Sequence, residues 1–329
     1  MLSRKENLSA GQMLAVMEEI MSGKSETEDI VSFLVSLSNK GETVEELTAA
    51  VEVMRKFSTK INSRESVILD TCGTGADKSG TFNISTVACF VASGAGITVA
   101  KHGNRSITSC CGSADILEEA GININMGKEK IEECLNKIGI AFLFAPDLHP
   151  AMRYAMAARK QIGRKTMFNI LGPLSNPAGA THQLMGVFDL GLTETLARVL
   201  SNLGSRHALV VHGLDGLDEI TTVKETRVSE ARQGKINNFE LTPEEFGLKR
   251  AKAEDLLGGS VGENVKILQG VLEGESGPQR DIVLLNAGAA IYAADKAKTI
   301  KDGINTAEKS IDSGAALEKL ELLKKYSQQ

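Results

Sequence analysis

Hydrophobic residues recur at helical spacing through the first 64 residues of the chain. They stand three and four positions apart in three consecutive segments, and a candidate capping box precedes each segment. The boxes are Ser9-x-x-Gln12, Ser25-x-x-Glu28 and Thr43-x-x-Glu46. Gly23 and Gly41 stand where helices commonly end. The pattern predicts a small helical domain over residues 1–64, with a polar linker at 58–63.

From residue 67 onward, short β-branched runs alternate with helical patterns. We expect strands at 67–70, 97–100, 140–144, 183–188 and 207–212. Helices are expected between them at about 83–94, 113–120, 128–138 and 193–203. Such alternation predicts a mostly parallel sheet with helices on its faces, and its ligands bind beyond the carboxyl ends of the strands. After residue 225 we expect a strand around 236–241 and helices near 264–273, 279–295 and 302–326.

The segment 148–180 interrupts this alternation. Its first half is a Met- and Ala-rich helical pattern that we expect to pack on the N-terminal helices. Residues 169–177 are interpreted as a rigid loop, because proline fixes φ and biases the residue before it toward extended backbone. The sequence therefore predicts the α/β class in two parts. A small all-helical domain at 1–64, joined by helices from about 148–180, accompanies a large α/β domain at 65–329.

Composition narrows the functional classes. The chain has 329 residues, of which 42% are hydrophobic and 24% charged, as in an ordinary soluble protein. A formal net charge of −5 argues against binding to nucleic acid or to an anionic membrane. There is no apolar run of membrane-spanning length and the first residues are too polar for a secretory signal, so a cytoplasmic location is expected. The 5 cysteines include no C-x-x-C pair, and neither disulfides nor a zinc site is indicated.

Two glycine-bearing segments, each between an expected strand and an expected helix, carry the candidate chemistry. The first is Asp70-Thr-Cys-Gly-Thr-Gly-Ala-Asp-Lys-Ser-Gly-Thr-Phe-Asn-Ile-Ser-Thr86, and the second runs from Lys101-His-Gly-Asn-Arg105 to Gly112-Ser-Ala-Asp115. This arrangement points backbone N–H groups at an anion, and Lys101 and Arg105 add positive charge. Either loop alone would be ordinary in an α/β protein, and neither matches a standard phosphate or dinucleotide motif. Together, with their many hydroxyls, they indicate a ligand with more than one phosphate.

Two further features could complete such a site. Asp218 and Glu219 are adjacent just past the strand expected at 207–212. Taken alone they could be a solvated acidic turn, but beside a polyphosphate they suit Mg²⁺, which neutralises a departing pyrophosphate. Arg159 is either a solvated helix charge or a clamp for a substrate carboxylate. The histidines show no metal-ligand spacing and no Gly-x-Ser-x-Gly pattern occurs, so covalent catalysis is not expected.

The chain resembles the anthranilate phosphoribosyltransferase family of tryptophan biosynthesis along nearly its whole length. The resemblance is carried by Gly73-Thr-Gly-Ala-Asp77, Thr81-Phe-Asn-Ile-Ser-Thr86, Lys101-His-Gly-Asn-Arg105 and Asn169-Ile-Leu-Gly-Pro-Leu-Ser-Asn-Pro177. It implies transfer of the phosphoribosyl group of 5-phosphoribosyl 1-pyrophosphate to the amine of anthranilate, with Mg²⁺. It also implies a homodimer formed through the helical domain. The chain departs from the family pattern at Ala76, where glycine is usual, and at the Cys110-Cys111 pair.

Carried over by motif, the resemblance implies three sets of site residues. The phosphoribosyl pyrophosphate set is Gly73, Ala76, Asp77, Thr81, Asn83, Ile84, Ser85, Thr86, Lys101, His102, Gly103, Asn104, Arg105, Ser106, Ile107, Thr108, Ser109 and Ser113. The anthranilate set is Gly73, Asn104 and Arg159, with Arg159 facing the carboxylate. The magnesium set is Ser85, Asp218 and Glu219. No catalytic acid, base or nucleophile is expected, because a neutral aromatic amine can attack the ribose C1 directly.

Two alternatives stay open at this point. Pyrimidine nucleoside phosphorylases are similar in architecture and carry a related Lys-His-Ser-Ser-Arg segment. The Lys-His-Gly-Asn-Arg segment, the Asp-Glu pair and the Gly-Pro-Leu run of this chain favour the anthranilate family instead. A non-catalytic relative that binds nucleic acid would need a basic face, which the acidic balance argues against.

Overall fold

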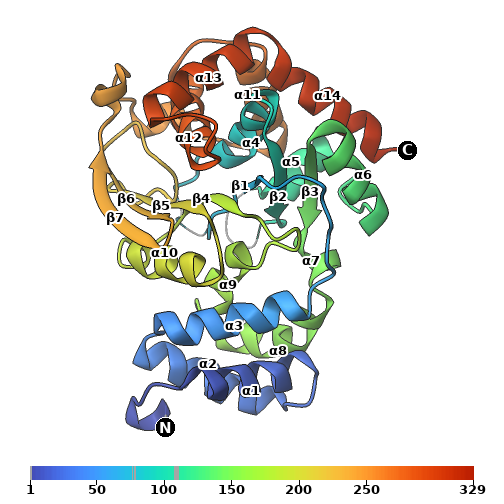
Figure 1. The fold of residues 1–329 in the computed structure, drawn as a ribbon, viewed down its shortest axis with the longest axis vertical. Coiled ribbons are helices and arrows are strands. Elements are labelled where there is room, and N and C mark those ends of the chain that lie inside the picture. The colour runs from blue at the N-terminus through green and yellow to red at the C-terminus, as the bar shows by residue number, and fades with distance from the viewer. Residues whose placement is uncertain (1, 76, 78, 107–110) are drawn as a thin grey trace.

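A seven-stranded sheet divides the protein, with helices on both of its faces (Figure 1). The computed structural model describes residues 2–75, 77, 79–106 and 111–329. The strands are β1 Ile68–Asp70, β2 Thr98–Gly103, β3 Ile140–Phe144, β4 His182–Gly186, β5 His207–Gly213, β6 Thr226–Arg232 and β7 Lys235–Leu241. Their order is β3-β2-β1-β4-β5-β6-β7, and β1 to β5 are parallel while β6 and β7 are antiparallel. The predicted mostly parallel sheet is confirmed.

Strand β6 was not predicted from the sequence. It forms a hairpin with β7, and the two turn residues between them, Gln233 and Gly234, have φ of +50° and +77°. Positive φ at both turn residues is the geometry of a tight hairpin turn that matches the twist of the strands. The polar alternation in Thr-Arg-Val-Ser-Glu-Ala-Arg hides the strand from a search for apolar runs.

The helices fall into two groups. Those before β1 and around 145–174 are α1 Ala10–Met21, α2 Thr27–Lys40, α3 Val44–Lys56, α7 Ala145–Leu148, α8 Arg153–Ile162 and α9 Phe168–Leu174. Those of the α/β part are α4 Ile84–Gly94, α5 Ser113–Glu119, α6 Lys128–Ile138, α10 Leu192–Asn202, α11 Val261–Leu272, α12 Pro278–Ala293, α13 Ile300–Asp312 and α14 Ala315–Ser327. None of the helices in the described part of the chain is both long and apolar enough to cross a membrane.

Two hydrophobic cores lie on the two faces of the sheet. In β5, Leu209 and Val211 join the core under α4 and α12, while Ala208 and Val210 join the core shared with α3, α9 and α10. Successive side chains of a strand point to opposite faces, so one apolar run serves both cores. Figure 1 shows the result as layers, with α12 and α13 above the sheet and α10, α9 and then α3 below it.

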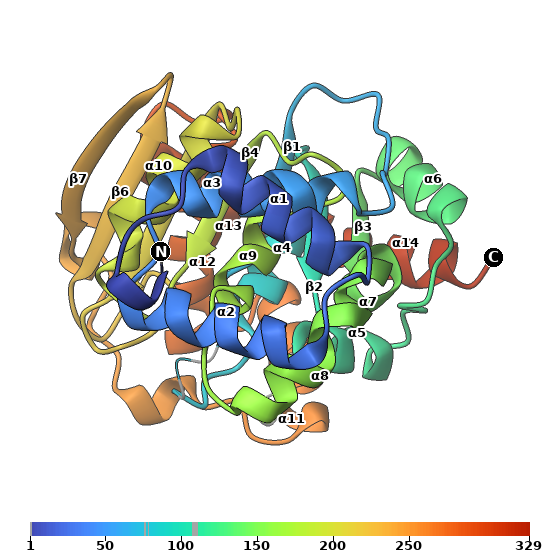
Figure 2. The ribbon, with the colours of Figure 1, turned by 90° about the horizontal axis from the view of Figure 1, so that it is seen from below.

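Helix α8 packs against α1 and α2, as the Met- and Ala-rich pattern predicts (Figure 2). The capping boxes at Ser9 and Thr43 form. The box predicted at Ser25 is wrong, because α2 starts at Thr27 with Glu26 as its N-cap and Ser25 stands one residue too early to cap it.

Two expectations about loops and helices are corrected. The segment 169–177 is not a loop throughout, since α9 covers Phe168–Leu174 with Pro173 inside it. A proline this close to the end of a helix removes one hydrogen bond from a turn that ends one residue later. The helix expected over 302–326 is two helices, α13 and α14, which are separated by Gly314 with φ of +78°.

Candidate active site

The predicted site residues gather at the carboxyl edge of the sheet. Strands β1, β2, β4 and β5 end there at Asp70, Gly103, Gly186 and Gly213. Lys101 to Gly103 lie inside β2, not in the loop where the sequence placed them, and the side chains of Lys101 and His102 are buried. Four predicted site residues, Ala76, Ile107, Thr108 and Ser109, lie outside the described residues.

The adjacent carboxylates Asp218 and Glu219 contact the first glycine segment at two positions, Gly75 and Ser85. The backbone N–H of Gly75 donates to Asp218 Oδ2 at 2.7 Å, and the N–H of Ser85 donates to Glu219 Oε1 at 3.1 Å. A Cβ atom built on Gly186 would lie 1.4 Å from the Asp218 carbonyl oxygen, so glycine is required for this approach. A Cβ atom on Gly73 would lie 2.9 Å from the Gly186 carbonyl oxygen. Gly186 is therefore packed closely against Asp218 and against Gly73.

A third carboxylate adds to the negative charge of this group. The N–H of Asp218 donates to Asp77 Oδ2 at 3.4 Å. Burial, followed by the charges of Asp77 and Glu219, raises the pKa of Asp218 well above its usual value. Burial also raises the pKa of Glu219 to about 7, although Lys101 and Ser85 oppose the shift. We call Asp77, Asp218 and Glu219 the carboxylate triad. Its hard oxygen atoms, with the Ser85 hydroxyl beside them, fit a divalent cation such as Mg²⁺.

Among the described residues, Lys101 is the cationic side chain that hydrogen-bonds to Ser85. Its ammonium donates to the Thr71 carbonyl oxygen at 3.0 Å and to Ser85 Oγ at 3.2 Å, and it is buried. Among the described residues, one ammonium stands beside three carboxylates, and the raised pKa values of Asp218 and Glu219 show that their charged forms are disfavoured without a further positive charge. A divalent cation would supply that charge.

The hydroxyl-bearing residues of the first segment are linked to one another. Ser79 Oγ donates to Asp77 Oδ2 at 2.7 Å and lies 3.1 Å from Thr81 Oγ1. Thr86 Oγ1 donates to Asn83 Oδ1 at 2.8 Å. Ile84, the first residue of α4, is buried in the core, so its backbone is the part that can face a ligand.

The second segment is organised around Asp115 of α5. Its carboxylate accepts hydrogen bonds from the N–H groups of Ser106 and Gly112, at 3.1 and 2.8 Å. Arg105 pairs with Asp115 at 3.0 Å and with Glu118 at 2.8 Å, and therefore lies against α5. Asn104 accepts at its carbonyl oxygen from Ser113 Oγ and from the Ala114 N–H.

Close packing also fixes Gly103, because a Cβ atom there would lie 2.2 Å from Ser113 Oγ. The ring of His102 is buried 5.1 Å from the ring of His149, and burial together with His149 lowers the pKa of His102 well below its usual value. The imidazole is therefore neutral. His149 had no motif to mark it in the sequence.

Arg159 lies apart from the triad, on α8. Its guanidinium stands 5.7 Å from the centre of the Phe168 ring, and partial burial lowers its pKa. Among the residues that the structure describes, no carboxylate lies within ion-pair distance of it. A half-buried guanidinium without an acidic partner can take a carboxylate from a ligand.

Asp70 is a buried residue of the site that sequence reasoning passed over. It accepts hydrogen bonds from the N–H groups of Cys72 and His102 and from Asn176 Nδ2, at 3.0, 3.2 and 2.7 Å. Burial raises its pKa to about 6. Asp70, Cys72 and His102 offer ligand atoms within 4.8 Å of one another, but the Asp70 oxygens are already occupied by these bonds.

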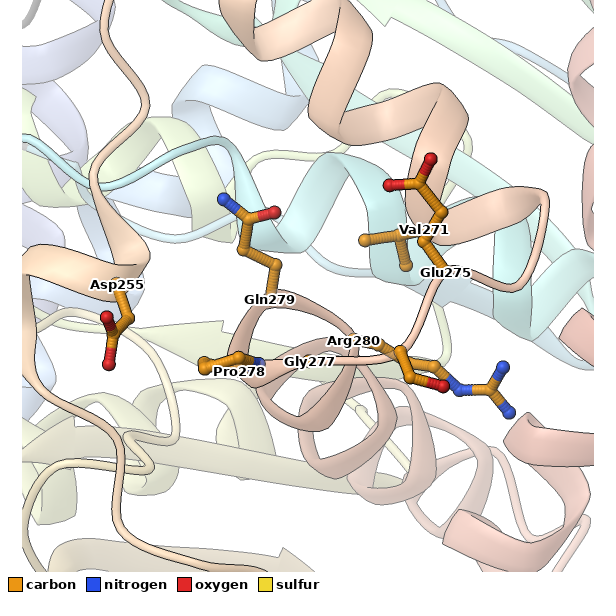
Figure 3. Close-up of a pocket in the computed structure, with 8 residues that line it drawn as sticks. Asp255, Val271, Glu275, Gly277, Pro278, Gln279 and Arg280 are labelled. Atoms are coloured by element: carbon orange, nitrogen blue, oxygen red, sulfur yellow. The ribbon is translucent and has the colours of Figure 1, made fainter.

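A separate pocket of about 240 Å³ lies between α11 and the start of α12 (Figure 3). Asp255, Val271 and residues 275–280 line it, and none of the predicted site residues is among them in the described chain. Its Arg280 is bonded to Asp312 and to the Gly274 carbonyl oxygen. These contacts occupy the guanidinium within the fold.

Comparison with known proteins agrees with the motifs. A family model described as glycosyl transferase family, a/b domain, matches residues 65–317, and one described as the helical bundle domain of that family matches residues 1–58. The anthranilate phosphoribosyltransferase of Alkaliphilus metalliredigens is 49% identical over 326 residues, which are 99% of this chain and 96% of the relative. That of Syntrophobacter fumaroxidans is 51% identical over 324 residues, or 98% of this chain and 96% of the relative. The chain belongs to the anthranilate phosphoribosyltransferase family.

Solved structures of anthranilate phosphoribosyltransferases share the fold. The enzyme of Thermus thermophilus superposes with a TM-score of 0.95 at 40% identity, covering 100% of this chain and 98% of that chain. The enzyme of Saccharomyces cerevisiae, in complex with PRPP and Mg, gives a TM-score of 0.88 at 29% identity over 98% of this chain and 94% of that chain. The predicted family and the predicted combination of a helical domain with an α/β domain are confirmed.

Proposed function

We propose that this protein transfers the phosphoribosyl group of 5-phosphoribosyl 1-pyrophosphate to the amine of anthranilate, as a step of tryptophan biosynthesis. The observation that carries the proposal is the contact of Asp218 and Glu219 with Gly75 and Ser85, which joins a metal-binding pair to a glycine segment suited to phosphates. Relatives named for this reaction support it, among them a yeast enzyme solved with PRPP and Mg and the same enzyme solved with 4-fluoroanthranilate.

Different residues of the chain would bind the two substrates. Ser85, Asp218 and Glu219 would hold Mg²⁺, which neutralises charge on the departing pyrophosphate. Arg159 would hold the anthranilate carboxylate by two parallel hydrogen bonds. The C1–O bond breaks with its electron pair on pyrophosphate, the amine nitrogen forms the new bond to C1, and the amine then loses a proton to solvent. Catalysis rests on position and electrostatics and needs no catalytic base.

The remaining residues assigned to the phosphoribosyl donor are part of the same proposal. Lys101 stands beside Ser85, and Asp77, Ser79 and Thr81 form one linked group at the start of the segment that leads to α4. Arg105 would have to leave Asp115 and Glu118 to reach a phosphate. Asn104 and Gly73 are proposed to contact anthranilate.

We also infer a homodimer in the cytoplasm. On α8, Met156 is 52% exposed and Tyr154 is 36% exposed, although both are large and apolar. Burying such side chains against a second copy of the chain lowers the free energy of the protein. Light scattering at micromolar concentration tests the dimer, and a monomer would contradict it.

We propose the domain boundary at residue 64, with the helices of about 148–180 belonging to the N-terminal domain, because α8 and α9 share a core with α1 to α3.

The proposed function is tested by following the loss of anthranilate fluorescence with phosphoribosyl pyrophosphate and Mg²⁺. We expect turnover by the wild type and, in Arg159→Ala, a KM for anthranilate raised about 10- to 100-fold by loss of a charged contact. The KM for phosphoribosyl pyrophosphate should stay within about twofold. A larger effect on the phosphoribosyl donor would place Arg159 at the wrong substrate. Phosphorolysis of pyrimidine nucleosides in place of transfer would favour the nucleoside phosphorylase alternative.

A further inference from the structure

Asn286, a buried residue of α12, hydrogen-bonds to the backbone of Ile220, the residue directly after Glu219. Asn286 Oδ1 accepts from the Ile220 N–H at 2.9 Å, and Asn286 Nδ2 donates to the Ile220 carbonyl oxygen at 2.8 Å. The second amide hydrogen goes to the Ile282 carbonyl oxygen at 2.9 Å. Asn286 and Ile220 are both fully buried. One side chain therefore satisfies both backbone groups of a residue that is 66 positions away in the chain.

This contact fixes the orientation of the metal-binding pair. The N–H of Ile220 and the carbonyl of Glu219 belong to one planar peptide unit, so holding the N–H also holds the backbone of Glu219. Asp218 and Glu219 are adjacent, and Asp77 Oδ2 accepts from the Asp218 N–H, so carboxylates of like charge are close together and the backbone that carries two of them must be held in place. An amide does this without adding charge to the site.

Helix α12 supports the site from a second direction. It packs on α4, whose second residue is Ser85, and on β4 and β5, which lead to Gly186 and to the Asp218 loop. Helix α12 therefore supports both the helix that carries the Ser85 hydroxyl and the strands that lead to the two carboxylates. No ligand motif marks Asn286 in the sequence, and its side chain is fully buried and bonded to backbone groups.

We propose that Asn286 is a positioning residue, which holds Asp218 and Glu219 in the geometry that takes a divalent cation. The inference rests on the proposed function for the identity of the cation and the substrate. Residues that orient metal ligands from behind typically change metal affinity or activity by about 10- to 100-fold when they are replaced.

The test compares two buried polar residues of the C-terminal helices. Ser310 of α13 is buried, and its Oγ donates to the Val91 carbonyl oxygen at 2.8 Å, near the opposite end of α4 from Ser85. Ser310→Ala is therefore a control for the loss of a buried hydrogen bond away from the site. Asn286→Ala removes both bonds to Ile220, while Asn286→Asp keeps the acceptor and loses the donors.

The readout is the Mg²⁺ concentration at which a fixed amount of phosphoribosyl pyrophosphate raises the melting temperature half-maximally, alongside the Mg²⁺ concentration for half-maximal turnover. We expect both to rise about 10-fold or more in the Asn286 variants and to stay unchanged in Ser310→Ala, whatever melting temperature each free protein has. Equal Mg²⁺ dependence in all variants would make Asn286 a purely structural residue and overturn the inference.

A second measurement covers variants that do not fold. In the metal-free wild type, the Ile220 amide should exchange with solvent deuterium as slowly as the amides of β5, because Asn286 holds it in the core. Fast exchange at Ile220 would overturn the inference without any variant. A wild type that turns over while Asn286→Ala keeps its Mg²⁺ dependence contradicts this inference alone, whereas a wild type without transfer activity contradicts the proposed function.

Discussion

Carboxylates gather at both edges of the sheet, and their electrostatics differ. At the carboxyl edge, the triad of Asp77, Asp218 and Glu219 crowds like charges together, and the pKa values of Asp218 and Glu219 are raised. At the amino edge, where β4 and β5 begin, Glu230 accepts from His207 Nε2 at 2.9 Å and from the Tyr292 hydroxyl at 2.6 Å. These hydrogen bonds, led by that of His207, lower the pKa of Glu230.

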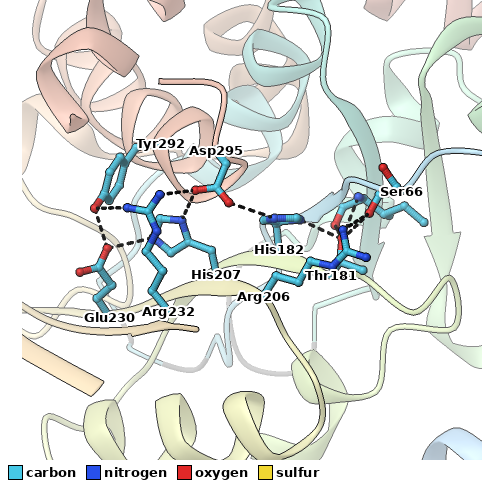
Figure 4. A network of polar contacts seen from close by, with 10 residues as sticks. Ser66, Thr181, His182, Arg206, His207, Glu230, Arg232, Tyr292 and Asp295 are labelled. Carbon is cyan, nitrogen blue, oxygen red and sulfur yellow. Dashed lines mark hydrogen bonds and ion pairs between the residues drawn. The ribbon is translucent and has the colours of Figure 1, made fainter. Parts of the chain in front are cut away.

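At the amino edge, the carboxylates of Glu230 and Asp295 are bonded to neighbouring side chains, and we call these residues the amino-edge group (Figure 4). His207 Nδ1 lies 3.0 Å from Asp295 Oδ1, which also accepts from Arg232 at 2.7 Å. Both ring nitrogens of His207 therefore lie within hydrogen-bond distance of a carboxylate. The group joins β5 and β6 to the residues at the end of α12, and Asp295 reaches His182 at 3.6 Å as well.

The difference distinguishes carboxylates that are paired within the fold from carboxylates that are not. At the amino edge, Glu230 and Asp295 each accept from neighbouring side chains. At the carboxyl edge, we expect a cation to relieve the repulsion within the triad. The same helix contacts both edges: Asn286 is bonded to Ile220, directly after Glu219, and Tyr292 is bonded to Glu230.

The largest expected effect comes from neutralising the triad. Asp218→Asn with Glu219→Gln should reduce kcat at least about 10²–10³-fold, since charge stabilisation of the leaving group is lost. The melting temperature of the free protein should not fall, because repulsion between buried carboxylates is removed as well. Near-normal turnover with an unchanged Mg²⁺ requirement would show that the pair does not hold the metal.

The amino-edge group should respond in the opposite way. His207→Ala removes a hydrogen bond from each of two carboxylates and is expected to lower the free energy of unfolding by about 1.5–3 kcal/mol. The KM values for both substrates should stay the same, because the group lies at the other edge of the sheet. Urea denaturation followed by circular dichroism measures the loss, and a loss below about 1 kcal/mol would contradict the balance described here.

The two edges should also give pH dependences of opposite sign. A raised pKa means that folded Glu219 binds a proton more tightly than unfolded Glu219, so metal-free stability falls as the pH rises from about 4.5 through about 7. The lowered pKa of Glu230 contributes stability that is present above about 4.5 and lost as the pH falls through its folded value. Glu219→Gln should remove the first trend and Glu230→Gln the second, as urea denaturation at several pH values would show. Identical pH profiles for wild type and Glu219→Gln would contradict the first assignment.

The smallest effect is expected at Arg105, whose ion pairs with α5 are exposed to solvent. Arg105→Ala should change the melting temperature of the free protein little, because exposed ion pairs contribute little stability. If Arg105 turns to the phosphoribosyl donor, the variant also loses part of the thermal shift that this donor gives with Mg²⁺. An undiminished shift would leave Arg105 with its contacts to α5 alone.

The sequence predicts what local pattern and motif encode. The strands from β1 to β5 and the glycine segments follow from apolar runs and turn residues that are contiguous in the chain. The contact of Gly75 with Asp218 was expected only in outline, from strand ends that share one edge. Asn286 and Gly186 could not be found in this way, because their roles arise from packing against segments distant in sequence. Strand β6 was missed for lack of an apolar run.

The central claim is that the carboxyl-edge triad is completed by a divalent cation. Isothermal titration calorimetry of phosphoribosyl pyrophosphate, with and without Mg²⁺, tests it most directly when wild type and Asp218→Asn/Glu219→Gln are compared. We expect the wild type to bind at least about 10-fold more tightly with Mg²⁺ and the variant to lose most of that difference. Equal Mg²⁺ dependence of binding in the two proteins would contradict the claim.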